Sequence, residues 1–124
     1  MKQPTNTLTG VALDWAVVLC ETWVNDCRSE RFLQIFKHQN STGQGYCYSR
    51  DWAAGGPIIE REKIEVKFVE EDIWHFDPPG PTSTWWAMYA GKGIWIGPTP
   101  LIAAMRCYVA SQLGDEVDIP EELA

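Results

Sequence analysis

Few residues in this chain are suited to acid–base or nucleophilic chemistry, and none lies in a recognised catalytic pattern. The two histidines, His38 and His75, fall in segments that we expect to be loops, with no nucleophile or metal signature around them. The serines lie in no Gly-x-Ser-x-Gly elbow, and the glycines form neither a P-loop nor a dinucleotide-binding fingerprint. We therefore expect no enzymatic activity and no catalytic residue.

The cysteines, with a histidine, would be numerous enough to bind a zinc ion. No Cys-x-x-Cys pair occurs among them, and two fall within apolar helical patterns, as buried structural cysteines do. The four are Cys20, Cys27, Cys47 and Cys107. We expect no metal and no other cofactor. The segment Met1–Thr7 lacks the apolar core of a signal peptide, so we expect a cytoplasmic protein with reduced cysteines.

The binding of a small anion has better candidates. Residues 97–100, Gly-Pro-Thr-Pro, open an expected helix, where free N–H groups and the Thr99 hydroxyl can hold a phosphate or carboxylate. Ordinary helix capping predicts the same residues. Arg106 lies two turns further along among apolar residues, and Arg61 follows the glycine pair Gly55 and Gly56.

The two guanidinium groups can serve either stability or binding. A guanidinium in apolar surroundings must find an internal carboxylate, for example Asp14, Asp51 or Glu60, or an anion from outside. In the second case six residues would form the ligand site. Trp52 would stack on a base, Arg61 and Arg106 would meet phosphate, and Gly55, Gly56 and Thr99 would offer backbone or hydroxyl donors.

The charge of the chain limits its partners. A formal charge of −7 and a pI near 4.7 argue against an extended nucleic-acid or anionic-membrane surface. No apolar run approaches the roughly 18 residues that cross a bilayer. The last ten residues contain five acids and no base, so the rest of the chain is nearly neutral and a local basic pocket is compatible with it.

Tryptophan is unusually frequent, with seven residues in 124 and four of them between positions 74 and 95. Large aromatic side chains can fill the core of a small domain. They can also form a surface for a planar ligand or anchor a protein interface. The composition leaves both interpretations open.

Apolar periodicity and capping residues predict two helices, at about 10–22 and 100–113. In the first, Asp14 is expected to face away from the apolar stripe and to complement the helix dipole. Alternation and strand-forming residues predict strands at 64–69, 84–89 and 94–96, with residues 70–83 as a long connection.

The middle of the chain is more ambiguous. Residues 25–40 fit either a short helix capped by Ser29 or a strand flanked by polar residues, and we favour irregular structure with a short strand. The polar, glycine-containing residues 39–45 predict a loop. Gly55, Gly56 and Pro57 predict a turn whose proline starts a short helix. Beyond Gly114 the acidic residues predict a partly ordered tail.

These elements predict an α+β fold in which a small antiparallel sheet of about three strands is covered by the 10–22 and 100–113 helices. Residues 1–114 would form a single sandwich domain and residues 115–124 an acidic C-terminal tail. Because a lone three-stranded sheet of this size leaves apolar surface to cover, we expect a homo-oligomer.

Four segments together resemble the NinX-like family of small tailed-phage proteins. They are Leu8–Val17, Asp51–Glu62, Gly97–Ser111 and Leu113–Val117, in order along nearly the whole chain. The resemblance implies a protein of a temperate phage or prophage of enteric bacteria, at work in the host cytoplasm. It also implies similarity to phage domains with a helix–sheet–helix sandwich, and it carries over no catalytic residue.

Two functions fit these expectations. The first is a non-enzymatic phage accessory protein that binds a small anionic, nucleotide-like ligand and so sequesters a host immune signal. The alternative is a protein-interaction module that inhibits a host factor through a Trp-rich surface at 74–95 and the acidic tail.

Overall fold

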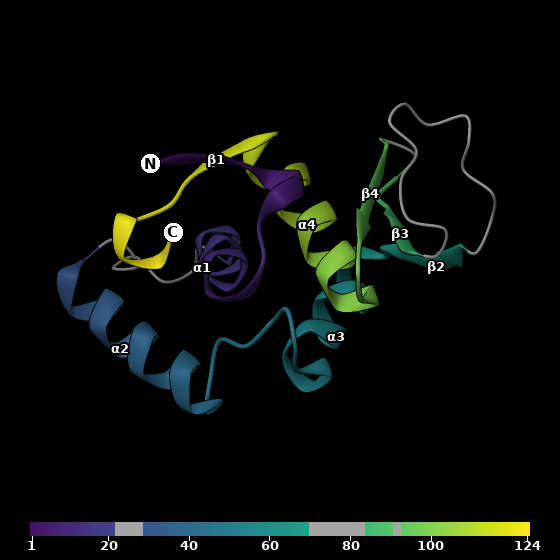
Figure 1. The fold of residues 1–124 in the computed structure, drawn as a ribbon. Coiled ribbons are helices and arrows are strands. Elements are labelled where there is room, and N and C mark those ends of the chain that lie inside the picture. Colours follow the sequence, from purple (N-terminus) through teal and green to yellow (C-terminus); the bar gives the residue numbers. More distant parts are fainter. Residues whose placement is uncertain (22–28, 70–83, 91–92) are drawn as a thin grey trace.

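A three-stranded antiparallel sheet and the helix packed behind it organise the chain (Figure 1). The computed structural model describes residues 1–21, 29–69, 84–90 and 93–124. The strands β2 (Glu65–Val69), β3 (Thr84–Met88) and β4 (Ile94–Gly97) lie side by side in chain order. The predicted α+β class and the three-stranded sheet are confirmed.

The helix α4 (Pro100–Leu113) packs against all three strands on one side of the sheet. Thr99 caps it as predicted, because its hydroxyl accepts the Ile102 N–H. The helix α1 (Gly10–Cys20) packs mainly on α4 rather than directly on the sheet. The two predicted helices therefore stack as successive layers behind the strands.

Residues 30–42 form a helix, so the expectation of irregular structure with a short strand was wrong. The Ser29 hydroxyl accepts the Phe32 N–H at the start of α2 (Glu30–Thr42), and Gly43 ends the helix in the left-handed conformation. The buried stripe of α2 is Phe32, Leu33, Phe36 and Asn40. Its last member is polar and the apolar Ile35 is exposed, so the helical periodicity was masked. His38, expected in a loop, also lies in this helix.

The helix α3 (Trp52–Glu62) begins five residues before the predicted start at Pro57. The Asp51 carboxylate accepts the Ala53 N–H at 3.0 Å and caps it, and Lys63 ends it with a positive φ of 56°. Pro57 lies inside the helix, where it cannot donate to the carbonyl four residues earlier. The glycine pair is thus helical and not a turn.

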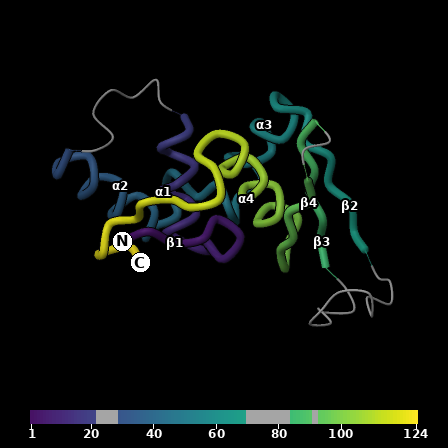
Figure 2. Tube along the Cα trace, turned by 90° about the horizontal axis from the view of Figure 1, so that it is seen from above, coloured from purple at the N-terminus to yellow at the C-terminus, as the bar shows by residue number. Residues whose placement is uncertain are grey.

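The acidic C-terminal residues are part of the fold, unlike the partly ordered tail expected from their composition. The strand β5 (Glu116–Asp118) pairs antiparallel with β1 (Lys2–Pro4), and both views place the two termini close together (Figure 2). Two short 3-10 turns, η1 (Thr5–Thr7) and η2 (Glu121–Leu123), flank these strands. Val117, Ile119 and Leu123 are buried in the core.

A polar network, here called the Asp14 network, joins α1, α2 and the 43–51 connection, and all its members except Arg50 are buried. It comprises Asp14, Asn40, Ser49 and Arg50. The Asp14 carboxylate accepts the Ser49 N–H and the Asn40 side-chain amide, both at 2.8 Å, and Arg50 donates to the Asn40 carbonyl. Asp14 is fully buried, so the prediction that it faces away from the core was wrong. Burial raises the pKa of its carboxyl above the ordinary value.

The described tryptophans lie in different environments. Trp15 lies in the core, Trp85 and Trp95 pack against its edge, and Trp52 is 55% exposed. Trp74 and the expected 70–83 connection lie outside the described residues, as does His75. Among the described residues, no helix has the length and apolar character needed to span a bilayer.

Candidate functional site

The predicted anion-binding residues lie at separate places on α3 and α4. Trp52 projects from the first turn of α3 and Arg61 lies nine residues later, roughly 13 Å along the helix axis. Thr99 and Arg106 are separated along α4 by roughly 10 Å. None of the six predicted residues lines either of the two hollows described below.

The two glycines differ in their surroundings. Gly55 is buried where α3 meets the preceding connection and α4: a Cβ there would lie 2.5 Å from the Tyr48 carbonyl oxygen and 2.7 Å from Leu101. Its own N–H donates to the Asp51 carbonyl within the helix. A Cβ at Gly56 would meet its nearest atom, on Trp52, at an ordinary 3.7 Å. Gly55 thus permits close packing of α3.

Arg61 has internal carboxylate partners. Its two terminal nitrogens donate to the two carboxylate oxygens of Glu21, each at 3.1 Å, and its Nε donates to Glu62 at 2.8 Å. The Tyr108 hydroxyl also accepts from Arg61 and donates to Glu21. Glu62 and Glu21 raise the pKa of the guanidinium. The partners differ from Asp14, Asp51 and Glu60, which the sequence suggested, because the fold brings the end of α1 beside α3.

Two main-chain carbonyl oxygens accept hydrogen bonds from Arg106. Its Nε donates to the Leu8 carbonyl and its Nη1 to the Ile96 carbonyl, both at 2.8 Å. Partial burial lowers the pKa of this guanidinium. Its bonding partners among the described residues thus include no carboxylate, and it links α4 to β4 and to the segment before α1.

A groove of about 420 Å³ runs along β5, between that strand, α1 and the start of α2; it is here called the β5 groove. Trp15, Leu33, Val117 and Ile119 form its buried apolar floor. The more accessible Leu19 and Leu113 line it as well. A side chain that enters the groove would therefore leave water for an apolar surface.

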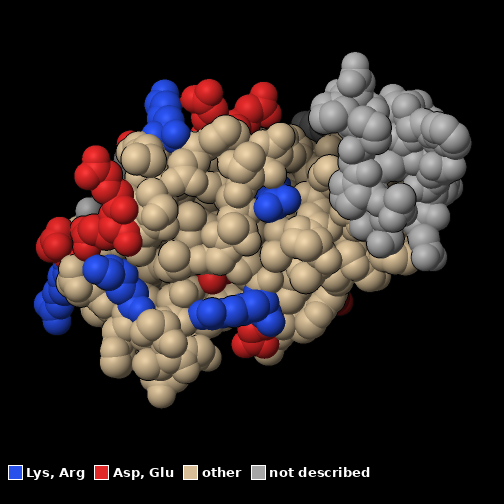
Figure 3. Space-filling view, viewed as in Figure 1, with Lys and Arg blue, Asp and Glu red and all other residues tan. Residues whose placement is uncertain are grey.

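Carboxylates surround this apolar floor. Glu30 at the start of α2 and Glu116 and Asp118 on β5 line the groove and are exposed. The Asp118 carboxylate accepts the N-terminal ammonium of Met1 at 2.9 Å, so its charge is balanced locally. Figure 3 shows acidic side chains along the upper and left edges of the molecule, where β1, β5 and η2 lie. The groove therefore combines apolar surface with net negative charge.

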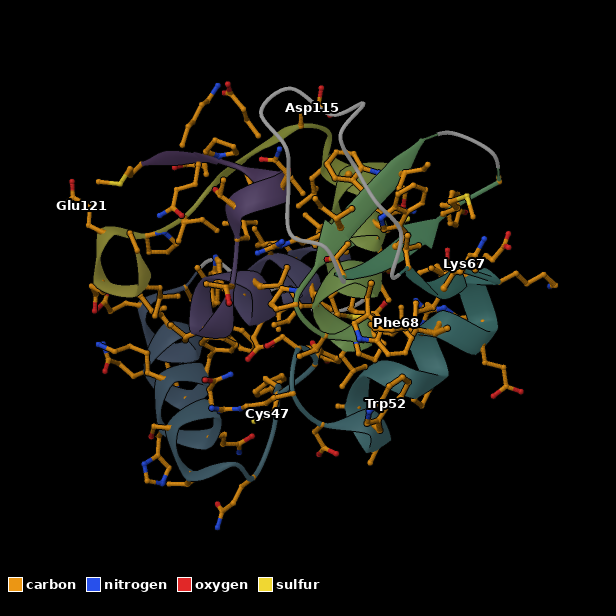
Figure 4. All side chains as sticks on the ribbon, turned by 45° about the vertical axis from the view of Figure 1, so that its right-hand side comes forward. Cys47, Trp52, Lys67, Phe68, Asp115 and Glu121 are labelled. Atoms are coloured by element: carbon orange, nitrogen blue, oxygen red, sulfur yellow. The ribbon has the colours of Figure 1, made fainter. Side chains whose placement is uncertain are left out.

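One wall of this groove, the strand β5, has a strand pattern in the sequence that the acidic composition of the last ten residues obscured. Residues 116–119, Glu-Val-Asp-Ile, alternate polar and apolar side chains, which is the pattern of a strand with one buried face. The other walls come from α1 and α2 and could be joined to it only by folding. Figure 4 places Asp115 and Glu121, on either side of this strand, far from Trp52 on α3.

A second hollow, of about 230 Å³, lies beside the C-terminal half of α4. Tyr89, Trp95, Cys107 and Asp115 are among its lining residues. Burial raises the pKa of the Cys107 thiol to about 11, so this cysteine is protonated at neutral pH and is not a thiolate nucleophile. Its place in the packed face of α4 agrees with a structural cysteine.

Comparison with known proteins supports the resemblance of the four sequence segments to the NinX-like family. None of the curated proteins compared with this chain matches it. A protein-family model described as bacteriophage P22, NinX, matches residues 5–112, which include α1, α2, α3, the three-stranded sheet and nearly all of α4. The chain therefore belongs to the bacteriophage P22 NinX family.

Proposed function

We propose that this phage protein acts without catalysis, as an accessory protein in the host cytoplasm that binds another protein through the β5 groove. The partner would insert a large apolar side chain that is flanked by lysine or arginine. One observation carries the proposal: the groove joins a buried apolar floor to the carboxylates of Glu30 and Glu116. Of the interaction module predicted from the sequence, this proposal keeps the acidic C-terminal residues and does not use the Trp-rich 74–95 segment.

The two parts of the groove would contribute differently. Transfer of a large apolar side chain from water to the floor contributes about 1.5–3 kcal/mol. An exposed ion pair at the rim contributes about 0.2–1 kcal/mol and weakens with salt. The formal charge of −7 would also speed encounter with a basic partner. The groove is thus an anchor, around which a larger interface selects the partner.

A peptide library tests this proposal. We expect peptides with a large apolar residue flanked by lysine or arginine to bind, and the same peptides with glutamate flanks not to bind. The double substitution Glu30→Gln with Glu116→Gln should weaken binding about fivefold or more, because it removes two of the three carboxylates at the rim and leaves only Asp118, which is paired with the N-terminal ammonium. Affinity is measured by fluorescence polarisation at low and high salt.

The matched control is Glu60→Gln with Glu65→Gln, which makes the same change of net charge at exposed positions outside the groove. This control should bind as the original protein does. Equal binding of basic and acidic peptides, or equal weakening by the two double substitutions, would contradict the proposal. Removal of residues 115–124 is unsuitable, because it deletes β5 and three buried side chains.

An anionic, nucleotide-like ligand is the second candidate, and one observation favours it: Arg106 has no carboxylate partner among the described residues. Arg61, by contrast, is already paired with two carboxylates. For this candidate we expect calorimetric heat with a cyclic dinucleotide or an ADP-ribose derivative. That heat should disappear in Arg106→Met and persist in Arg61→Gln, with folding checked by circular dichroism. No heat at protein concentrations of tens of micromolar would reject the candidate.

A further inference from the structure

The second hollow, beside the C-terminal half of α4 and here called the α4 hollow, has two aromatic side chains in its lining. Trp95 on β4 lies opposite the buried Ala87 of β3. Tyr89 follows Ala87 by two residues along the chain. Both aromatic side chains are partly buried and pack against the core, so part of each stays accessible. The hollow therefore offers two π-systems to a bound molecule.

Small residues leave the space beside these rings open. A Cβ added at Gly93, which also lines the hollow, would meet no atom of the described residues within 4 Å beyond its chain neighbours. On α4, Ala110 and Ser111 follow Cys107 by three and four residues and so lie on the same side of the helix. The volume of about 230 Å³ is below the roughly 300–1,000 Å³ of sites for drug-sized ligands. The hollow therefore suits a small molecule.

A carboxylate stands at the rim of the α4 hollow. Asp115 lines the hollow and is exposed, just beyond the end of α4 (Figure 4). Its carbonyl accepts the Thr5 N–H at 2.7 Å, which fixes its main chain. No lysine or arginine of the described part of the chain pairs with the Asp115 carboxylate or lines the hollow. This negative charge is thus available to a cation from solution.

The position of the Tyr89 ring is supported from α3. Its hydroxyl donates to one carboxylate oxygen of Glu62 at 3.5 Å, and the other oxygen accepts the Arg61 Nε at 2.8 Å. The hydroxyl is therefore already occupied, whereas the ring face can still attract a cation through its quadrupole.

The lining also distinguishes between kinds of cation. The indole N–H of Trp95 can only donate, and the side chain of Ala110 has no polar atom. Against these groups the N–H donors of a simple ammonium would lose their hydrogen bonds to water without replacement. A fully methylated ammonium has no N–H donor and presents an apolar surface to the aromatic rings. The hollow therefore favours the methylated form.

We propose that the α4 hollow binds a small organic cation with a methylated ammonium group, of the kind that choline carries. The ammonium would lie against Trp95 and Tyr89, and Asp115 would balance its charge. The β5 groove is a different site, and this proposal does not depend on the proposed function.

Choline and 3,3-dimethylbutan-1-ol test the proposal, because they share one shape and differ in the charge of a single atom. Binding is followed by heteronuclear NMR through the indole N–H signal of Trp95, which is identified by its loss in Trp95→Phe. Choline should shift this signal to saturation, with a dissociation constant of about 1 mM. The neutral alcohol should bind at least about tenfold more weakly, since it lacks the cation–π and ionic contacts.

Two substitutions test the location of the cation. Asp115→Asn removes the rim charge and should weaken choline binding about threefold or more. Ala110→Leu keeps a good helix former and fills the hollow, so it should weaken binding at least about tenfold. Glu121→Gln is the matched control for Asp115→Asn, because it makes the same change of charge at an exposed position outside the hollow (Figure 4). This control should bind choline as the original protein does.

Four results would overturn the proposal. The first is a Trp95 signal that does not shift with up to about 20 mM choline, and the second is equal affinity for choline and the neutral alcohol. The third is unchanged choline binding in Ala110→Leu. The fourth is equal affinity of Asp115→Asn and Glu121→Gln for choline. Thermal unfolding of each variant, measured by circular dichroism, separates a lost site from a lost fold.

Discussion

Asp14→Ala is expected to lower the free energy of unfolding by about 3 kcal/mol. Asp14 is fully buried and accepts two hydrogen bonds, from the Ser49 main chain and the Asn40 side chain. Alanine would leave two buried donors without an acceptor, and each such donor costs about 1–3 kcal/mol. Loss of the buried charge offsets part of this cost. Urea unfolding followed by tryptophan fluorescence measures the change.

Asp14→Asn is the informative companion, because its side chain has the same size but a single acceptor oxygen. It should destabilise the protein by less than Asp14→Ala, since one of the two donors stays paired. A change below about 0.5 kcal/mol for the alanine variant would contradict the structural role of the Asp14 network.

The pH dependence of stability, compared between the original protein and Asp14→Asn, gives a further check. Burial raises the pKa of Asp14 in the folded state above that in the unfolded chain. The unfolded chain therefore releases this proton more readily, and the Asp14 contribution to stability falls as pH rises through the folded pKa. As pH is lowered from 7 toward about 4, the stability of the original protein should improve relative to Asp14→Asn. A constant difference across that range would contradict the raised pKa.

Gly55→Ala and Gly56→Ala should change stability in opposite directions, although the two glycines are adjacent in α3. A Cβ at Gly55 would lie 2.5 Å from the Tyr48 carbonyl oxygen, which cannot move without the main chain. The strain should exceed the gain of about 1 kcal/mol in helix propensity, for a net loss of about 2 kcal/mol. At Gly56 the added methyl meets ordinary contacts and should stabilise the helix by about 0.5–1 kcal/mol.

Thermal and urea unfolding of the two variants measure this difference. Each variant is the control for the other, because both add one methyl group to the same helix. Two stabilised variants would show that α3 can move away from Tyr48 and Leu101. Two destabilised variants would show that the glycine pair is needed for a reason other than close packing.

Elements with strong local signals were predicted well. The helix α4 has a capping threonine, a proline at its first position and a broad apolar face, and its predicted bounds of 100–113 match the structure. The strands of the sheet were found within one residue at each end. In each case the residues that define the element are contiguous, so their pattern is visible without the rest of the fold.

Elements with buried polar groups or misleading composition were missed. The helix α2 buries Asn40, which is acceptable because Asp14, 26 residues earlier, and the Tyr46 carbonyl accept hydrogen bonds from its amide. The last ten residues were set apart for their five acids, although three of their apolar residues, Val117, Ile119 and Leu123, lie in the core. Composition described the exposed side of β5, whereas burial of Val117 depends on the packing of β5 against β1 and α4.

The sequence by itself determined the NinX resemblance, the α+β class, the capped α4 and the three strands, because local periodicity and contiguous segments carry that information. The tertiary structure determined the bonding partners of the charged side chains and the position of the groove on the surface. Arg61 pairs with Glu21, Arg106 donates to the Leu8 carbonyl 98 residues earlier, and the β5 groove is assembled from four separate segments. Such contacts join residues far apart along the chain, so their geometry exists only after folding.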